Sequence, residues 1–429
     1  MATAETALHA LPRTGLELID PAVYERGGPP HEAWSALRRL PEIPRFEPTG
    51  YEPFWPITRH AEICSISKRP QLYRNAPGIV LLREEDIAFR RSGEGLAAMR
   101  TIIEMDPPEH RVYRKVASPW FTPRALARVD EAVEASAREL VDGLRARAEG
   151  REGTCDFVQE IAVPHPLRIL STILGIEREL EPTVLRLTNQ LFAADDPDLQ
   201  RPAADRRQAL MELGLELYQL FTRIIEDRRT RPRDDLATLL ACAKIDGAPM
   251  PPMETVGYYL IVFTAGHDTT KNALAGGMHL FLDHPSEFAK LQRNPERVNG
   301  AVEEIVRMVS PVNYMKRTTA AETEIAGTRI PAGENLILFY ASANRDERVF
   351  EDPFAFRIDR RPNPHVGFGI GEHFCLGAHL ARRSQRALWR ELSRRLEWVE
   401  PAGEPAWIRS NFVVGLKRLP IRYRLRPDA

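Results

Sequence analysis

The sequence has almost no net charge and very few cysteines, and these two shortages exclude several classes of protein. Its 59 lysines and arginines balance 60 aspartates and glutamates over 429 residues. Such a balance leaves no electrostatic footprint for nucleic acid or for a membrane surface. The four cysteines are widely separated and form no zinc-ligand pairs. We therefore expect no disulfide framework and no nucleic-acid partner.

The chain also lacks a long apolar segment at its start, low-complexity linkers and internal repeats. Charged residues recur throughout residues 1–30, so we expect neither a signal peptide nor a membrane anchor, and we predict a soluble, cytoplasmic protein. Nothing in the composition divides the chain. We therefore expect a single domain over residues 1–429, with a sizeable core, that acts as a monomer.

Helical patterns dominate the sequence, and strand patterns are short. The apolar stretch from Val256 to Leu282 has the length and composition of a long buried helix. Further helices are predicted at 123–144, 180–192, 204–229 and 235–244. Short strands are predicted at 54–60, 323–330, 335–339, 413–416 and 421–425, the last two as a hairpin. The predicted fold class is mainly α with a small β region.

The most informative segment is a glycine-rich run, His365-Val-Gly-Phe-Gly-Ile-Gly-Glu-His-Phe-Cys-Leu-Gly377. Its glycines at 367, 369 and 371 allow backbone angles and a close approach that suit a large planar group. A proline-free helical pattern follows Cys375, so the helix dipole favours a thiolate there. A thiolate ligand on haem iron promotes cleavage of the oxygen–oxygen bond. The segment favours a haem-thiolate site over the alternative, a buried thiol in a turn.

The pattern Phe-Gly-x-Gly-x-His-x-Cys-x-Gly, from Phe368 to Gly377, resembles the haem-ligand loop of the cytochrome P-450 superfamily, and the unanchored chain resembles its bacterial soluble class. The resemblance implies that family's fold, with haem between a long central helix and the cysteine loop. It implies Cys375 as the iron ligand, with Phe368, Gly369 and His373 in the cofactor site. The sequence has no CxxCH motif, so this haem b would be held non-covalently.

A second motif, Ala265-Gly-His-Asp-Thr-Thr270, places polar residues inside the long apolar helix. Adjacent threonines and an aspartate compete for backbone hydrogen bonds and can open a helix locally. An acid beside a hydroxyl can also relay protons. The alternative is a helix kink with Asp268 facing solvent. The motif is similar to the acid-alcohol pair of the family, which implies catalytic roles for Asp268 and Thr269.

Glu304 and Arg307 are three residues apart and therefore share one helical face. By itself such a pair is an ordinary solvated ion pair. In the family a glutamate and an arginine at this spacing pair inside the fold with a second arginine from a later segment, for which Arg360 is our candidate. The resemblance implies a structural role for these three residues.

The two propionates of a haem require cations, and the sequence offers several. His110 and Arg114 lie one turn apart on a predicted helix that begins near two prolines. They resemble the residues with which the family binds propionates, and Arg317 and His373 would complete the set. Taken singly, each could be a surface charge.

The walls of the substrate pocket are expected in segments that vary within the family. Apolar side chains in these segments suit a lipophilic substrate, although any one of them could belong to the ordinary core. Similarity to bacterial hydroxylases of terpenoids, steroid side chains, branched lipids and alkanes implies a terpenoid, steroid or fatty-acyl substrate. The steroid and lipid hydroxylases of the family more often carry asparagine before the acid, whereas a terpene-alcohol hydroxylase resembles this chain at His267. This resemblance favours a terpenoid. The candidate pocket residues are Ile79, Val80, Ala265, Val312, Tyr314, Phe412 and Val413.

The resemblance implies a monooxygenase that uses dioxygen to hydroxylate an unactivated C–H bond. No flavin or nicotinamide domain is recognisable, so a ferredoxin with its reductase would supply electrons. A basic surface for an acidic ferredoxin, or simply a solvated helix face, is predicted at Arg111, Lys115, Arg382, Arg383 and Arg386. Two alternatives are a peroxide-driven peroxygenase, which typically lacks the acid-alcohol pair, and a non-catalytic haem-binding sensor.

Overall fold

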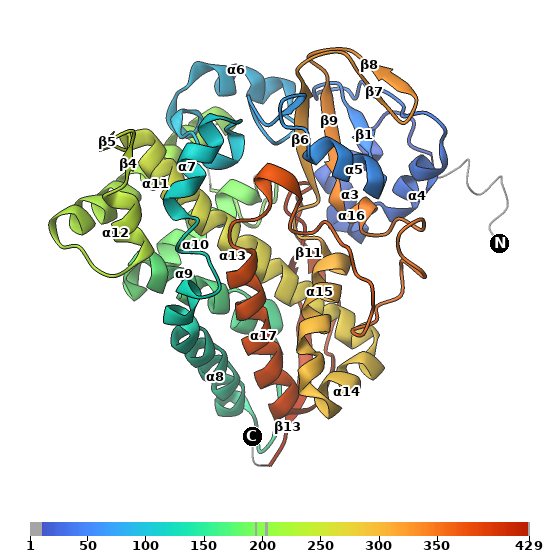
Figure 1. The fold of residues 1–429 in the computed structure, drawn as a ribbon. Coiled ribbons are helices and arrows are strands. Elements are labelled where there is room, and N and C mark those ends of the chain that lie inside the picture. Colours follow the sequence, from blue (N-terminus) through green and yellow to red (C-terminus); the bar gives the residue numbers. More distant parts are fainter. Residues whose placement is uncertain (1–10, 194, 202–204, 428–429) are drawn as a thin grey trace.

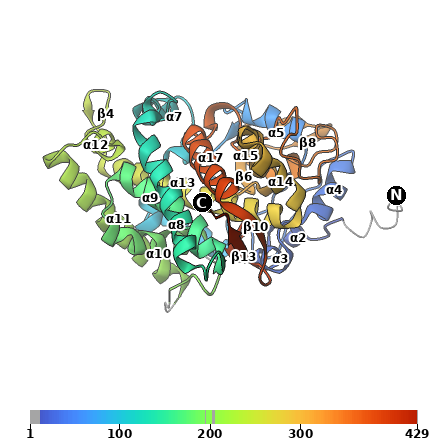
Figure 2. The same ribbon diagram turned by 90° about the horizontal axis from the view of Figure 1, so that it is seen from below.

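The structure is a computed structural model that describes residues 11–193, 195–201 and 205–427. Helices fill most of the molecule, and the largest sheet lies to one side of them, with the amino-terminal helices beside it (Figure 1). A turned view places α8 and α17 close together near the carboxy terminus (Figure 2). The predicted class, mainly α with a small β region, is confirmed.

The α-helices vary from a single turn to 32 residues. They are α2 (Leu16–Ile19), α3 (Pro21–Gly27), α4 (His31–Arg39), α5 (His60–Ser67), α6 (Glu84–Ser92), α7 (Glu109–Ala117), α8 (Asp130–Arg147), α9 (Pro164–Leu174), α10 (Glu181–Phe192), α11 (Arg206–Thr230), α12 (Leu236–Ala241), α13 (Pro252–Asp283), α14 (Pro285–Arg293), α15 (Val298–Val309), α16 (Tyr340–Ala343) and α17 (Ala378–Arg395).

The strands form one four-stranded sheet, one three-stranded sheet and several two-stranded pairs. They are β1 (Trp55–Ile57), β2 (Tyr73–Arg74), β3 (Glu152–Asp156), β4 (Lys244–Ile245), β5 (Ala248–Pro249), β6 (Tyr314–Thr319), β7 (Thr323–Ile325), β8 (Thr328–Ile330), β9 (Asn335–Phe339), β10 (Leu396–Pro401), β11 (Ala406–Trp407), β12 (Leu416–Arg418) and β13 (Pro420–Leu425). The largest sheet has the order β1-β9-β6-β2, and only its β1–β9 pair is parallel.

Several predicted elements differ from those in the structure. The segment 323–330 is a hairpin of β7 and β8, because Ala326 and Gly327 adopt positive φ angles of 50° and 76° and reverse the chain. The helix predicted at 235–244 ends at Ala241, since Lys244 and Ile245 pair with β5 across a turn at Gly247. Ala204, where we predicted another helix to begin, lies outside the described residues.

The predicted carboxy-terminal hairpin is wrong. Strand β12 pairs with β11, whereas β13 lies between β10 and β3 in a different sheet. Only Leu419 separates β12 from β13, and a hairpin connection needs at least about two residues. The backbone of Leu419 instead bonds to Asp156 and Phe157, which carries the chain from one sheet to the other.

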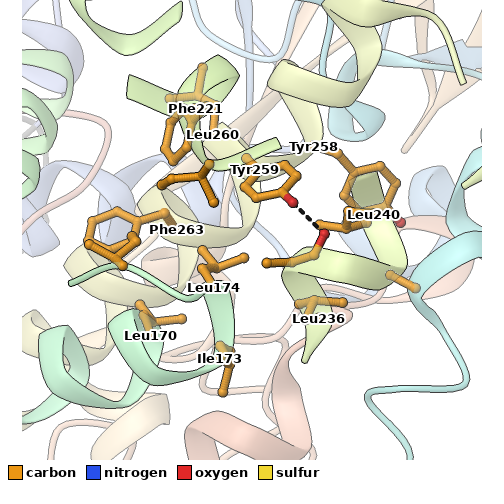
Figure 3. Packing of buried hydrophobic residues seen from close by; sticks show 14 of the residues in the cluster. Leu170, Ile173, Leu174, Phe221, Leu236, Leu240, Tyr258, Tyr259, Leu260 and Phe263 are labelled. Carbon is orange, nitrogen blue, oxygen red and sulfur yellow. Dashed lines mark hydrogen bonds between the residues drawn. The ribbon is translucent and has the colours of Figure 1, made fainter. Parts of the chain in front are cut away.

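Helix α13 occupies the centre of the molecule, as the long apolar stretch predicted. Hydrophobic residues occur all round this helix because neighbouring helices cover it on several sides. Figure 3 shows one such contact, where the hydroxyl of Tyr259 donates to the carbonyl oxygen of Ala237. The packed side chains there come from α9 (Leu170, Ile173, Leu174), α11 (Phe221), α12 (Leu236, Leu240) and α13 (Tyr258, Tyr259, Leu260, Phe263).

This packing holds α13 in place at the centre of the molecule, and the helix also forms one wall of a cavity. None of the helices in the described ranges is both long and apolar enough to cross a membrane.

Candidate active site

A cavity of about 240 Å³ lies between α13 and the glycine-rich loop that precedes α17. Ala265 and Thr269 line it from the helix. Phe368, Gly369 and Cys375 line it from the loop. The structure therefore brings the two sequence motifs, more than 90 residues apart in the chain, to opposite walls of one space.

The loop keeps its shape because its glycines occupy positions that no other residue fits. Gly369 and Gly371 have φ angles of 68° and 77°, in the left-handed region. A Cβ at Gly371 would also lie 2.3 Å from the carbonyl oxygen of Ser67. The amide of Cys375 donates to the carbonyl oxygen of Phe368 at 2.9 Å, which closes the loop and directs it at the cavity.

The thiol of Cys375 lies in surroundings that favour its neutral form. Burial raises the pKa of Cys375, although the N–H of Gly377 and the guanidinium groups of Arg114 and Arg382 act in the opposite direction. The sequence-based expectation that the helix start would favour a thiolate is therefore outweighed, since α17 begins only at Ala378. A metal cation at the sulfur would reverse this balance, because a coordinated thiol loses its proton.

Four basic side chains predicted to bind propionates all line the same cavity, namely His110, Arg114, Arg317 and His373. The rings of His110 and His373 lie 4.0 Å apart. Both ring nitrogens of His110 and Nε2 of His373 are buried without a hydrogen-bond partner. Burial and the neighbouring His110 lower the pKa of His373 to about 2. An unpaired imidazole N–H beside the guanidinium groups of Arg114 and Arg317 fits a ligand that carries carboxylates.

These observations test whether the site fits a haem. The cavity has a glycine-rich wall that includes Cys375, two arginines in its lining, and two histidines whose ring nitrogens lack hydrogen-bond partners. A porphyrin with two propionates and an iron atom would satisfy all three features. The residues present therefore fit the group that the sequence predicted.

The acid-alcohol pair is divided between two faces of α13. Thr269 lines the cavity, and its hydroxyl donates to the carbonyl oxygen of Ala265 at 2.6 Å. Asp268 is 2% exposed and lies outside the lining, with one carboxylate oxygen 2.5 Å from Nζ of Lys271. Burial alone would raise the pKa of Asp268, but the Lys271 ammonium outweighs it and holds the pKa well below its usual range.

This arrangement contradicts the solvent-facing alternative for Asp268, whereas its catalytic role stays a prediction. The carboxylate neither borders the cavity directly nor faces solvent as the alternative required. Helix α13 also continues without a break through Thr269 and Thr270, so the expected local opening is not present. Asp268 and Thr269 face different sides of this unbroken helix because neighbouring residues are separated by about 100° around its axis.

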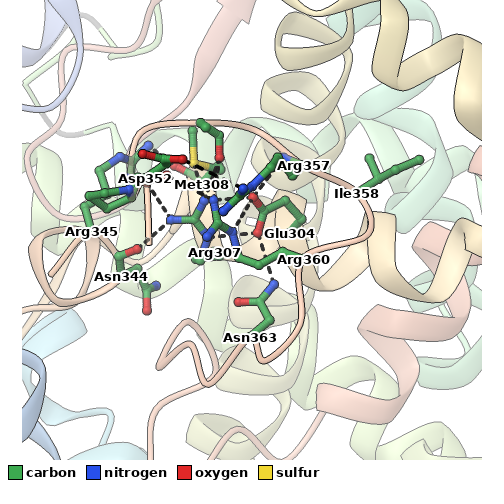
Figure 4. Close-up of polar contacts among 12 residues, drawn as sticks. Glu304, Arg307, Met308, Asn344, Arg345, Asp352, Arg357, Ile358, Arg360 and Asn363 are labelled. Carbon is green, nitrogen blue, oxygen red and sulfur yellow. Dashed lines mark hydrogen bonds and ion pairs between the residues drawn. The ribbon is translucent and has the colours of Figure 1, made fainter. Parts of the chain in front are cut away.

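Glu304, Arg307 and Arg360 form a buried ion cluster (Figure 4). The guanidinium of Arg307 donates to both carboxylate oxygens of Glu304 at 2.8 Å. Arg360 donates to the same carboxylate at 3.0 Å, and the side chain of Asn363 adds a further bond at 3.1 Å. The structure thus brings together the three residues that the sequence proposed as a structural set, and it adds Asn363 to them.

Two of the seven candidate pocket residues, Ala265 and Val312, line the cavity. The other five, Ile79, Val80, Tyr314, Phe412 and Val413, lie outside its lining. As substrate contacts, these five stay predictions.

Strand geometry explains why Tyr314 lies outside the lining of this cavity. Alternate residues of a strand face opposite sides, and Met315 and Arg317 of β6 face the cavity. Tyr314 therefore points away and packs against Phe339 and Phe412, with ring centres 5.9 and 5.4 Å apart. A shift of one residue in the strand separates the prediction from the observed wall.

Other lining residues were not predicted. Val262, Gly266 and Ala273 of α13 line the cavity at helical spacing from Thr269, so the period of the helix was a usable signal. Asn75 gave no such signal, since it enters the wall only because Asp106 binds its backbone amide at 2.8 Å. Further unpredicted lining residues are Ile102, Ile103, Phe121, Ile261, Thr270, Met315 and Tyr340.

The predicted basic surface is partly neutralised. Arg382 donates to Glu303 at 2.6 and 2.8 Å, and its guanidinium lies 4.2 Å from the ring centre of Phe368. Arg383 pairs with Asp130. Arg111 pairs with Glu372, and Arg386 donates to Asn299. Lys115 is exposed on α7.

Comparison with known proteins decides the family. The family model described as Cytochrome P450 matches residues 80–425. The chain belongs to the cytochrome P450 family. A relative named Cytochrome P450-terp, from Pseudomonas sp, is 37% identical over 387 residues, which cover 87% of this chain and 89% of the relative.

Other relatives of this cytochrome P450 are named as monooxygenases. Linalool 8-monooxygenase from Pseudomonas putida is 32% identical, with 94% of this chain and 98% of the relative covered. Steroid C26-monooxygenase from Rhodococcus jostii is 33% identical, with 96% and 85% covered. The solved structure of CYP108D1 from Novosphingobium aromaticivorans has a TM-score of 0.86 and 34% identity, covering 99% of this chain and all of that one.

These matches establish the cytochrome P450 fold and a monooxygenase enzyme. The family implies a haem with a cysteine thiolate ligand, and Cys375 is the cysteine that lines the cavity.

Proposed function

We propose that this cytochrome P450 binds haem b without a covalent link and hydroxylates an unactivated C–H bond of a lipophilic terpenoid, steroid or fatty-acyl substrate. The observation that carries the proposal is the cavity itself, with Thr269 on one wall and Cys375 on the other. The overall reaction converts a C–H bond, dioxygen, two electrons and two protons into an alcohol and water.

Bound haem supplies the activation of dioxygen, and the chain supplies binding, orientation and protons. The sulfur of Cys375 would hold the iron. The four basic side chains at one end of the cavity would bind the propionates and fix the orientation of the ring. Thr269 places a hydroxyl at the wall facing Cys375, where a proton must arrive.

The wall contributed by the protein is mainly apolar, which supports a lipophilic substrate. The apolar residues that line the cavity include Ile103, Val262, Val312 and Met315. Such a surface excludes water and holds a hydrocarbon mainly by burial, at about 25 cal/mol for each Å² removed from water. Relatives named as linalool and steroid monooxygenases are both similar to this chain. We favour a terpenoid because of the resemblance at His267, and we keep a steroid as the next candidate.

We propose that a ferredoxin with its reductase supplies the electrons. Lys115 and the arginines near the cysteine loop support an acidic partner, although several of these arginines already have acidic neighbours. Long-range attraction of this kind raises the association rate more than the affinity.

The function is tested by titrating the purified ferric protein with terpenoids, steroids and fatty acids while haem spin state is followed by absorbance. We expect a saturable shift with one class, and hydroxylated product when ferredoxin, reductase and dioxygen are added. Product formation with peroxide alone, and none with the electron donors, would identify a peroxygenase. Failure of oxygen consumption with every donor would indicate a haem-binding sensor.

A further inference from the structure

Three titratable side chains meet on the face of α13 that turns away from the cavity. His267, Asp268 and Lys271 are 0%, 2% and 4% exposed. None of the three belongs to the cavity lining, whereas Ala265 and Thr269 do. The cavity and this buried group therefore share one helix and lie on different faces of it.

Lys271 and Asp268 form the first contact of the group. Nζ of Lys271 lies 2.5 Å from Oδ1 of Asp268, three residues earlier on the same helix. A buried carboxylate without a partner is very costly, so the ammonium is what allows Asp268 to stay ionised here. Both residues belong to α13, and the elements packed against this helix keep their contact out of solvent.

His267 and Asp268 form the second contact, and it is incomplete. Nδ1 of His267 lies 3.6 Å from Oδ2 of Asp268, and neither atom has a hydrogen-bond partner. Nε2 of His267 lies 3.2 Å from the carbonyl oxygen of Val163, which can only accept, so Nε2 carries the hydrogen. Nδ1 is then an acceptor that faces a second acceptor.

Two buried acceptors that face each other have room for one proton between them. A proton on either atom would create a charge-assisted hydrogen bond and satisfy both groups. The ring of His267 is held for this contact by Phe263, which stacks on it at 5.9 Å with a 15° angle between the planes. Nδ1 of His267 and Oδ2 of Asp268 are therefore placed so that one proton could be shared between them.

We propose that Nδ1 of His267 and Oδ2 of Asp268 hold a proton destined for Thr269, and that Lys271 keeps Asp268 turned toward His267. The inference rests on the proposed function, because hydroxylation consumes two protons for each product. The group takes a proton from solvent, changes its net charge from zero to plus one, and returns to zero when the proton moves to the cavity. No covalent bond other than the N–H or O–H bond changes.

The role of Lys271 is positional. Asp268 adjoins Thr269 in sequence but faces the opposite side of the helix, so its side chain must turn before it can serve the cavity. The contact with Lys271 opposes this turn and returns the carboxylate to His267 afterwards. His267 holds the proton, Asp268 transfers it, and Lys271 sets where Asp268 rests.

The test compares haem-loaded variants with the same substrate and the same electron donor. His267→Asn keeps a polar group near Oδ2 but cannot carry the proton. Lys271→Met removes the charge, and Lys271→Arg restores it. Thr264→Val is the matched control, since Thr264 is buried on α13 and its hydroxyl donates only to the carbonyl oxygen of Leu260 in the helix.

We expect His267→Asn to slow product formation at least about tenfold, to raise peroxide release and to increase the solvent deuterium isotope effect. Lys271→Met should do the same, Lys271→Arg should recover most of the loss, and Thr264→Val should match the wild type. Unchanged rates and isotope effects in both His267→Asn and Lys271→Met would overturn the proposal.

A second measurement does not depend on turnover. Infrared difference spectra of the holoenzyme during a pH titration should contain a carboxyl or imidazole band that disappears in both Asp268→Asn and His267→Asn. A band lost only in Asp268→Asn would show that His267 does not share the proton, and would also overturn the proposal. Absence of product from the wild type with every substrate would instead count against the proposed function.

Discussion

Nε of Arg360 lies 3.0 Å from Oε1 of Glu304, although the two residues are 56 positions apart in the chain. Arg360 also donates to the carbonyl oxygens of Glu351, Asp352 and Ala355, so one side chain fastens an irregular segment to α15 (Figure 4). That segment leads directly into the loop that presents Cys375. The ion cluster therefore supports the cysteine loop without touching the cavity.

Replacing Arg360 with alanine should destabilise the protein by about 3–5 kcal/mol, because it leaves part of a buried carboxylate without its partner. Guanidinium denaturation of the holoenzyme, followed by the haem absorbance, measures the change. Arg422→Ala is the control, since Arg422 and Glu400 are 56% and 44% exposed, and a surface pair contributes at most about 1 kcal/mol. Equal effects of the two substitutions would contradict the structural role.

Cys375→Ala should abolish thiolate ligation. The ferrous carbonyl complex should lose the red-shifted absorbance that thiolate ligation gives, because no other thiol lines the cavity within the described ranges. Cys64→Ala serves as the control, since Cys64 lies on α5 and its loss should leave the spectrum unchanged. An unaltered carbonyl spectrum in Cys375→Ala would remove the ligand assignment.

Thr269→Ala should retain haem and substrate binding but lose coupling. Its hydroxyl borders the cavity, so its removal should divert reducing equivalents to peroxide and lower product yield at least about tenfold. The ratio of peroxide to product per electron pair measures the change. Thr270→Ala removes a neighbouring hydroxyl from the same wall. If both variants lose coupling equally, Thr269 has no special role.

The pairing of Glu303 makes part of the stability dependent on pH. Burial alone would raise the pKa of Glu303, but hydrogen bonds from Arg382 and His365 outweigh it and lower the pKa to about 2. The unfolded chain has the ordinary value of 4.5. The contribution is therefore complete above pH 4.5 and is lost as the pH falls toward 2.

Glu303→Gln tests this dependence. The difference in unfolding free energy between the wild type and Glu303→Gln should be largest near pH 6 and should shrink steadily from pH 4.5 to pH 3. Denaturation curves at several pH values measure it. A difference that stays constant over this range would show that the pKa of Glu303 is not lowered by folding.

Lys115→Glu should slow association with an acidic ferredoxin and reduce the dependence of the rate on salt, because Lys115 is an exposed charge on α7. Stopped-flow reduction at several ionic strengths measures both quantities. Arg329→Glu on β8 is the control, since Arg329 is 79% exposed and lies on a different part of the surface (Figures 1 and 2). The same slowing by both substitutions would argue against a local docking site.

Arg382 gives a less direct test of the same surface. It is bound to Glu303 and packs over Phe368, so charge reversal there should also lower thermal stability. Charge reversal at Lys115 leaves the cysteine loop intact, so an altered association rate there reflects the surface charge alone.

The features that the sequence predicted correctly are local ones. The cysteine loop and the helix around Thr269 are continuous segments, so their glycine pattern and apolar period are visible without a fold. The boundaries of β9 and α10 were similarly accessible, because a turn signal precedes β9 and Pro182 lies in the first turn of α10. Pairing of strands was not, since β12 pairs with β11 instead of β13, and β13 pairs with β3, far away in the chain.

Orientation around an element was decided by tertiary structure. The sequence identifies Asp268 as an acid beside an alcohol, but only the packing of α13 determines that Thr269 faces the cavity while Asp268 meets Lys271 behind it. The same holds for Tyr314 and Met315 on β6. Both are large apolar residues, but only Met315 faces the cavity. Sequence thus determined which chemical groups the protein carries. The fold decided which of them meet, because the direction of each side chain follows from the way whole elements pack.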